Sequence, residues 1–535
     1  MSALIMAITA TRERISAGSA CAGGARRAWT SPLGTRFFRP AVFFSALIGF
    51  VQPACAEQWH FEPSLRIDET LTNNVNLEPH DVRRGDLVTG LTPSLRIVET
   101  GAHTSLSGFI SLPALLYART GSENDRVDPY VNLLGKWEMV DRLLFVEGSV
   151  YVTQQYLSPF GARPQDLTTA TENRFTNQTY RISPYIKGDT SDYSYELRDN
   201  NIWTKGDANV VNGAYTNELI GTFQRDPRPL GWAVDIDRSV TKFQDQSDQS
   251  LALGRVRGLY QFDPQARMSV TAGYEHNDLL LESKSNPIYG LGVRWRPTEL
   301  SNVDVSWEHR FFGASYDVAF ENRTPLSVWN LRASRNVTTY PQQLATLPAG
   351  GDVAGILNQL FLSRVPDPAA RQTLINQYIA DRGLPQFLNG PVNLYTQQVT
   401  LQESFIATMG LLGARNSVFL TAYRLRQAPI TGSGNTVPDP LAGLTDNTQY
   451  GTSVVWTHAL TPVMTLTGAV DLLRTVDNTE TGGSTRQGGI RAEITTRIAP
   501  YTDVYGGIRY QVLRSTLTTD YDELAVFVGV GHVFH

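Results

Sequence analysis

Apolar and polar residues alternate at every second position through most of the chain after residue 58, a period that predicts β-strands. In the segment 302–312 one face is apolar, and the other carries charged and hydroxyl side chains. The apolar members are Val303, Val305, Trp307 and Phe311, and the polar members are Asp304, Ser306, Glu308 and Arg310. Charges on one face of many strands are favourable only where that face meets water, while the apolar face can meet lipid. The alternation therefore predicts a transmembrane β-barrel with a wet lumen.

The connections between the alternating segments are by turns short and long, with one tight exception near Gly313. Short turns on one side and long loops on the other are typical of outer-membrane barrels, in which the short turns are periplasmic. The segments predict an all-β fold, an antiparallel barrel of about 22 strands (20–24), with both termini on the periplasmic side.

The last segment, 520–535, is an apolar alternating strand with a penultimate aromatic residue. One face carries Leu524, Val526, Val528 and Val530, and Phe534 continues that face at the end. A terminal strand of this kind resembles the segment by which outer-membrane barrels are recognised and closed. Phe534 is therefore predicted to be the C-terminal signal for the barrel-assembly machinery.

The link 339–392 is far longer than the others and carries two helical patterns. The first spans 352–363, with Ile356, Leu357, Leu360 and Phe361 on one side. The second begins with Asp367 and Pro368 and ends before Gly383 and Pro385, and its apolar stripe is Leu374, Ile375, Tyr378 and Ile379. Amphipathic helices in an extracellular loop must bury their apolar sides. They are expected either over the outer mouth or inside the barrel, as a lid or constriction.

Residues 1–56 combine six arginines, an apolar run at 41–51 and an Ala-Cys-Ala sequence ending at Ala56. This pattern predicts a secretory signal peptide, with residues 57–535 as the barrel; lipidation of Cys55 is the alternative. Both cysteines of the chain, Cys21 and Cys55, lie in this leader, so no disulfide or thiol site is expected after it. Removing its six arginines and one glutamate takes the formal net charge from −5 to −10, which disfavours a nucleic-acid partner.

Motifs for catalysis, cofactors or metals are not found in the sequence. Charged residues of three neighbouring segments are expected on the lumen face, as a cross-strand ladder of opposite charges. Its members are Glu275, Arg294, Arg296, Asp304, Glu308 and Arg310. The ladder either stiffens the wall of a wide barrel or forms a polar lining for a sugar or ion path.

Several short segments between residues 57 and 160 resemble one protein family. They are PSLRI at 63–67 and again at 93–97, TNNVNL at 72–77, DLVT at 86–89, LFVE at 144–147 and QQ at 154–155. In these segments the chain resembles the PEP-CTERM system-associated outer-membrane proteins. The resemblance implies a barrel found with exosortase and exopolysaccharide genes, hence partners in polysaccharide or surface-protein export. The resemblance implies no active-site residues for this chain.

The sequence leaves three functions open. The first is a Gram-negative outer-membrane barrel that serves exopolysaccharide or PEP-CTERM surface-protein export, and the family resemblance favours it. The second is a general or solute-specific porin. The third, an outer-membrane enzyme, is disfavoured because no catalytic constellation is found. A receptor with an N-terminal plug domain is not expected, because strand-like sequence begins within a few residues of Ala56.

Overall fold

The barrel region is described by a computed structural model, and the predicted leader, 1–56, lies outside the described residues. Those residues are 58–208, 211, 213–243, 248–278, 284–345, 353–362, 364–366, 371–372, 374–375, 378–379, 384, 388, 390–393, 395–430, 446–480 and 482–534. The strands are β1 (Gln58–Thr72), β2 (Asp86–Thr100), β3 (Thr104–Ser111), β4 (Ala114–Tyr117), β5 (Arg126–Val127), β6 (Tyr130–Val140), β7 (Leu144–Tyr156), β8 (Arg174–Asp189), β9 (Tyr193–Gly206), β10 (Ala214–Arg225), β11 (Leu230–Phe243), β12 (Gln249–Gln261), β13 (Ala266–Asn277), β14 (Lys284–Thr298), β15 (Ser301–Arg310), β16 (Gly313–Arg323), β17 (Ser327–Thr338), β18 (Thr400–Leu412), β19 (Asn416–Pro429), β20 (Asn447–Thr461), β21 (Met464–Asp477), β22 (Gly483–Ala499), β23 (Thr502–Ser515) and β24 (Tyr521–Val533). The helices are α2 (Gly121–Asn124), α3 (Tyr340–Ala345) and α4 (Val353–Phe361).

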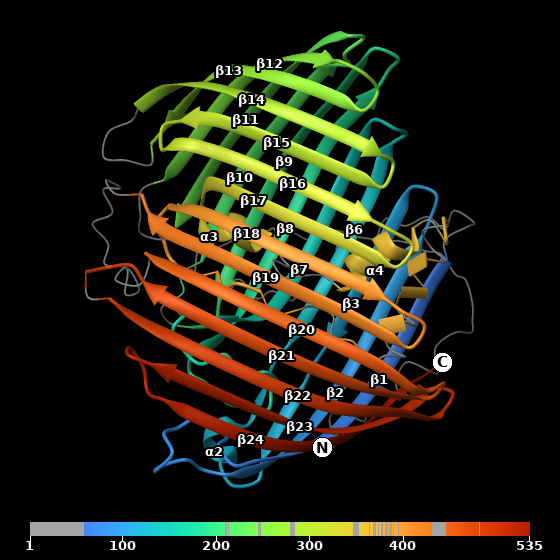
Figure 1. Cartoon of the computed structure of the whole chain (residues 1–535), viewed down its shortest axis with the longest axis vertical. Coiled ribbons are helices and arrows are strands. Elements are labelled where there is room, and N and C mark those ends of the chain that lie inside the picture. The colour runs from blue at the N-terminus through green and yellow to red at the C-terminus, as the bar shows by residue number, and fades with distance from the viewer. Residues whose placement is uncertain are drawn as a thin grey trace, which may run out of the picture. The chain divides into compact units, whose positions relative to one another are not determined.

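The strands form one closed antiparallel sheet (Figure 1). β1 pairs with β2 on one side and with β24 on the other, from Ser64 opposite Val533 to Thr72 opposite Ala525. β3 and β4 both pair with β2 and are two parts of one broken strand, and β5 and β6 continue each other against them. The barrel therefore has 22 strands, which confirms the predicted fold and strand number.

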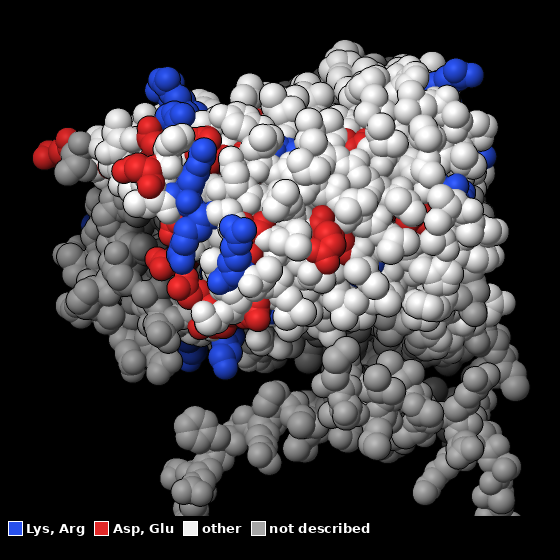
Figure 2. Space-filling model, turned by 90° about the horizontal axis from the view of Figure 1, so that it is seen from below, with Lys and Arg blue, Asp and Glu red and all other residues white. Residues whose placement is uncertain are grey.

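The outer face of the sheet is apolar over a continuous belt. Val270, Leu291, Ile490 and Val526 lie on four different strands, and each leaves more than half of its side chain exposed, at 59%, 53%, 56% and 52%. Exposed apolar area of this extent is stable only against lipid. Figure 2 shows one side of the barrel with charged side chains gathered toward one end and a largely uncharged surface beyond them. The belt identifies the chain as a transmembrane outer-membrane barrel.

Short and long connections alternate at the two ends of the strands, as predicted. One end carries turns of two to four residues, such as 299–300, 324–326 and 413–415, together with the chain ends of β1 and β24. The other end carries the long connections, including 73–85, 157–173 and 339–399, and the tight turn 311–312 before Gly313, whose φ of +92° suits glycine. We refer to these as the short-turn end and the long-loop end, and assign them to the periplasm and the cell surface.

The described parts of the long connection 339–399 lie inside the barrel rather than over its mouth. α4 packs against inward-facing residues near the short-turn ends of four strands, namely Val328, Leu412, Phe419 and Val455. Arg364 donates to the carbonyl oxygen of Pro325 in a short turn, at 2.7 Å. The segment leaves β17 at the long-loop end, so it runs through the lumen to the opposite end and returns to β18. Of the two predicted positions, the structure therefore shows the interior.

The helices of this connection agree in part with the sequence pattern. α4 lies within the predicted span 352–363, and its apolar residues Ile356, Leu357, Leu360 and Phe361 are buried. The second predicted helix, 367–383, lies only partly within the described residues, and those described in it, 371–372, 374–375 and 378–379, are helical. α3 was not predicted, because its six residues, YPQQLA, are too few to show a helical period.

Phe534 follows β24 on the outer face and continues the closing seam. Its backbone N–H donates to the carbonyl oxygen of Pro63 at 2.8 Å, and 45% of the residue is exposed. Replacing Phe534 with Asp should sharply lower the amount of assembled barrel, because an aromatic end and a lipid-facing apolar group are both lost. The measurement is the fraction of outer-membrane protein that migrates faster on a gel before boiling than after it.

Trp59→Asp is the matched control for this variant. Trp59 is an exposed aromatic residue of β1, near the same end of the barrel, and is 50% exposed. If both variants lose the folded form equally, Phe534 acts as an ordinary belt residue. Wild-type levels of folded Phe534→Asp barrel would show that the terminal residue is no assembly signal.

Candidate functional site

The lumen is divided by the internal segment 339–399, which packs against opposite walls. Its apolar half fills the side next to β17–β20, where Val353, Leu357 and Ile375 are fully buried. α4 can lie close to β18 because residue 410 of that strand is a glycine. A Cβ at residue 410 would lie 2.5 Å from Ile356 Cγ2. Each buried side chain of this size contributes about 1.5–3 kcal/mol relative to an exposed one, so the helix is held firmly against the wall.

The polar half of the segment crosses the lumen at the long-loop end. α3 packs against β8, β9 and β10, and Tyr340 and Leu344 form a buried cluster with Phe175 and Tyr395. Gln342 reaches Glu218 of β10 at 3.4 Å. Burial raises the pKa of the Tyr340 hydroxyl, which therefore stays neutral. α3 thus bridges from the wall at β17 and β18 to the wall at β8–β10.

A cavity of ≈ 430 Å³ lies between this bridge and the strands β10–β12, β15, β17 and β18. Amide side chains are the commonest polar groups in its lining. They are Gln249, Asn336, Gln342, Gln343, Asn393 and Gln402. Charged members include Glu218, Asp237, Arg255 and Arg310. An amide both donates and accepts hydrogen bonds, so this wall can bind hydroxyl-bearing solutes in many orientations.

A second cavity, of ≈ 250 Å³, continues along the same wall toward the short-turn end. Arginine and carboxylate side chains of β11–β15 line it, and Arg255 lines both cavities. Asp235 receives two bonds from Arg257, at 2.6 and 2.9 Å. Arg294 Nε donates to Asp304 at 2.7 Å. The two cavities form a polar path along β10–β15, which at its long-loop end also reaches β17 and β18.

The structure places the six residues of the predicted charge ladder on the lumen face, but their pairing differs from a simple ladder. Arg294 and Asp304 are direct cross-strand partners. Glu275 of β13 pairs at 2.7 Å with Arg310 of β15, past the intervening strand. Glu308 receives both its bonds from Arg255 of β12, at 2.9 and 3.0 Å, and Arg296 donates to the Asn302 amide at 3.2 Å.

Inward-facing glycines explain the Arg255–Glu308 pair, which passes over two neighbouring strands. Gly273 lies opposite Arg255, and Gly290 lies opposite Glu308. A Cβ at residue 273 would lie 3.1 Å from Arg255 Cγ, and one at residue 290 would lie 2.8 Å from Glu308 Cγ. Without side chains at these two positions, the Arg255 and Glu308 chains can lie across β13 and β14 and meet. The sequence signal was a pair of glycines in the polar register of these two strands.

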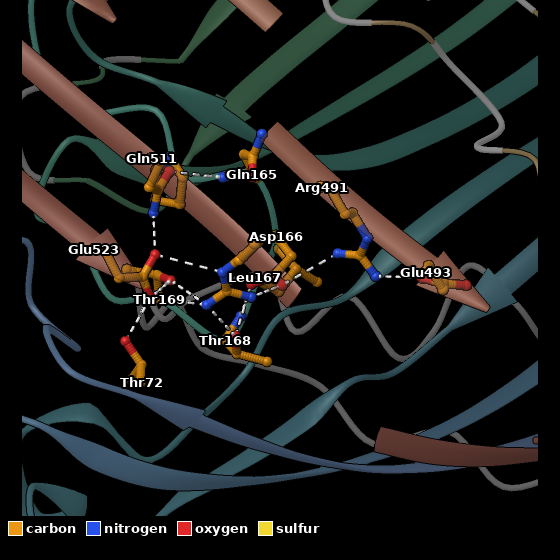
Figure 3. A network of polar contacts seen from close by, with 12 residues as sticks. Thr72, Gln165, Asp166, Leu167, Thr168, Thr169, Arg491, Glu493, Gln511 and Glu523 are labelled. Carbon is orange, nitrogen blue, oxygen red and sulfur yellow. Dashed lines mark hydrogen bonds and ion pairs between the residues drawn. The ribbon is translucent and has the colours of Figure 1, made fainter. Parts of the chain in front are cut away.

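A second connection, 157–173, also turns inward and binds the opposite wall at β20–β24 (Figure 3). Arg509 of β23 is fully buried and bonds to Asp166, to the hydroxyls of Thr168 and Thr169 at 3.0 and 2.8 Å, and to Glu523 at 2.9 Å. Glu523 of β24, also fully buried, accepts a further bond from Thr72 of β1 at 2.6 Å. One buried ion pair therefore joins the loop 157–173, the last two strands and β1.

The two internal segments meet at Gln449 of β20. Its side-chain oxygen accepts from the Val392 backbone at 3.0 Å and from Arg163 at 3.2 Å, and its amide donates to the Val392 carbonyl at 2.9 Å. The sequence did not single out Arg163 or Asp166, because they lie in a loop without periodicity and their partners are more than 280 residues away. Arg509 and Glu523 were not singled out either, although they are 14 residues apart on neighbouring strands. The only signal was the inward register of Arg509 and Glu523.

Two further features were sought in the described part of the chain, a metal-binding group and a membrane-spanning helix. No group of three or more His, Cys, Asp or Glu residues could hold a metal ion there. None of the helices described is long and apolar enough to cross a membrane.

Comparisons with known proteins place the barrel among structures of low sequence identity. No family model matches the sequence, and no curated protein matches it. Similar solved structures include the siderophore receptor PirA from Pseudomonas aeruginosa, with 9% identity over 89% of this chain and 81% of that chain and a TM-score of 0.39. A mutant of the ferric enterobactin receptor PfeA from the same organism has 8% identity over 89% and 80%, with a TM-score of 0.44. OpdO, also from Pseudomonas aeruginosa, has 10% identity over 89% and 98%, with a TM-score of 0.31.

Proposed function

We propose that this protein is an outer-membrane channel for hydroxyl-rich solutes of the saccharide class, and that it serves exopolysaccharide or surface-protein export. The proposal of a saccharide channel rests on the amide-lined cavity between the internal segment and the barrel wall. The proposal of a role in export rests on the resemblance of residues 57–160 to the PEP-CTERM system-associated outer-membrane proteins. The internal segment 339–399 then sets the width of the path at the larger cavity, because its residues Thr339, Gln342, Gln343, Asn393 and Val399 line that cavity.

The chemistry of the path suits a neutral polar solute. In the cavity near the short-turn end, most charges occur as ion pairs such as Arg257 with Asp235 and Arg294 with Asp304, and Arg267 is the lining charge without an ion pair among the described residues. Paired charges leave little net field along the path, while the amides nearer the cell surface offer hydrogen bonds to hydroxyl groups. A less selective porin is the second candidate, and the same ion pairs favour it, because they bind no particular solute.

Current block by neutral oligosaccharides in planar bilayers tests the channel and its selectivity. The wild-type protein should show a block that deepens with oligosaccharide length. The double variant Gln342→Ala/Asn393→Ala should need a several-fold higher concentration for the same block, because two amides of the cavity are lost. The measurement is the single-channel current at a series of oligosaccharide concentrations.

The matched control is Gln178→Ala/Asn322→Ala, which removes two amides from the outward register of β8 and β16. Equal block in all three proteins would favour the less selective porin. A folded protein that conducts no ions would contradict the channel itself. The proposed export role is tested separately by the genes next to this one, and a neighbourhood without exosortase or polysaccharide genes counts against it.

A further inference from the structure

Four arginines lie in one row on the outer face of the barrel, near the long-loop end. Arg424 of β19 lies opposite Tyr450 of β20, and Tyr450 lies opposite Arg474 of β21. Arg474 in turn lies opposite Arg486 of β22, and Arg486 lies opposite Arg514 of β23. The row therefore follows the hydrogen-bonding direction across five consecutive strands. Three of its arginines are adjacent to one another.

The outward direction of the row follows from its neighbours along each strand. Leu472 lies two residues from Arg474, Ile490 lies four residues from Arg486, and Tyr510 lies four residues from Arg514; they are 60%, 56% and 42% exposed. Residues two or four apart in a strand share a face. The arginines therefore extend the lipid-facing side of the sheet, just beyond its apolar belt on the cell-surface side. Charged groups gather toward one end of the face shown in Figure 2.

The charges of the row are only partly compensated within the protein. Arg424 pairs with Glu403 at 2.6 Å, and Arg514 has Asp520 at 3.8 Å. Among the described residues, no carboxylate lies within 4.0 Å of the guanidinium of Arg474 or Arg486. Like charges directly opposite each other on neighbouring strands are destabilising. An anion held between these side chains removes that repulsion.

The depth of the row identifies the anion. Tyr450 lies in the row itself and is exposed, and exposed aromatic residues form a girdle at the interface between lipid tails and head groups. A row at that level faces the head groups of the outer leaflet. Arginine binds phosphate with paired, charge-assisted hydrogen bonds, and adjacent arginines can share one phosphate. We propose that Arg474, Arg486 and their neighbours Arg424 and Arg514 bind the phosphate groups of a phosphorylated glycolipid in the outer leaflet.

Reconstitution of the whole barrel in vesicles of defined lipid tests this site. Phosphatidylcholine vesicles are prepared alone, with bis-phosphorylated lipid A, or with lipid A from which both phosphates have been removed. The readout is the temperature at which the fast-migrating folded form on a gel is lost. Phosphorylated lipid A should raise this temperature for the wild-type protein, and the dephosphorylated lipid should not.

The double variant Arg474→Gln/Arg486→Gln should lose that rise while keeping its midpoint in phosphatidylcholine alone. The matched control, Arg142→Gln/Arg415→Gln, removes two exposed arginines from the short-turn end and should keep the full rise. The site is rejected if both lipid A forms act alike, or if the Arg474/Arg486 variant keeps the rise. It is also rejected if inorganic phosphate or the acidic polysaccharide alginate gives the same stabilisation without lipid A.

Discussion

Replacing residues 350–388 with a short Gly-Ser linker should raise the single-channel conductance several-fold. These residues include α4 and the apolar cluster that fills the lumen beside β17–β20. A barrel of this strand number is wide enough for an aqueous channel when nothing occupies it, so removal of the filling segment widens the path. The measurement is conductance in planar bilayers, with heat-modifiable migration on gels as evidence that the barrel still closes. Unchanged conductance in a folded barrel would place the constriction elsewhere.

Point variants test whether the conductance depends on how α4 is held against the wall, with the rest of the segment still present. Leu357→Ser/Leu360→Ser replaces two buried leucines and should loosen the helix, giving larger or noisier conductance. Each buried leucine contributes about 1.5–3 kcal/mol, so the pair is a large part of what holds the helix to the wall. Gln359→Ser, on the less buried side of the same helix, should leave conductance as in the wild type.

Substitution of Arg509 by Ala should release the loop 157–173 from the far wall. The change leaves Glu523 buried without its arginine, and breaking a buried ion pair in this way costs roughly 3–5 kcal/mol. Because the only cysteines lie at 21 and 55, upstream of the barrel, a single Cys at residue 167 reports on the loop. Its labelling by an added maleimide should be at least about tenfold faster in the Arg509→Ala background.

Arg238→Ala is the control for this experiment, because Arg238 is an exposed residue of β11 on the outer face. It should leave the labelling rate at residue 167 unchanged. If Arg509→Ala also leaves it unchanged while the barrel remains folded, the loop is held by its other contacts, such as the bonds of Arg163 to Gln449 and Thr475.

The fold could be predicted from the sequence because lipid and water act on alternate residues of every strand. In β13 and β14 the alternation of Val270 and Leu291 with polar neighbours is enough to assign both faces. The break of one strand into β3 and β4, with Leu112 and Pro113 between them, has no periodic signal. Its counterpart is split in the same way into β5 and β6. The number of strands could therefore be predicted from the sequence, and the interruptions within single strands could not.

The lumen could be predicted only in part. The ladder residues were found because each lies in the polar register of a regular strand. Their pairing could not be predicted, because inner-face side chains reach strands two or three positions away, and Arg255 and Glu308 do so across two glycines. The loop 157–173 was a polar link in the sequence, and nothing in its residues indicated that Asp166 binds Arg509. Partners separated by most of the chain are set by barrel closure, which no local pattern contains.

Glu523 links closure of the barrel seam to the filling of the lumen by the loop 157–173. The carboxylate binds Thr72 across the seam between β24 and β1, and it binds Thr169 and Arg509 inside the barrel. A sheet that closed without the loop 157–173 in place would leave this carboxylate with fewer partners than it needs. Closure and filling are therefore thermodynamically coupled. The most stable product of insertion is therefore a barrel in which the seam is closed and the loop 157–173 occupies the lumen.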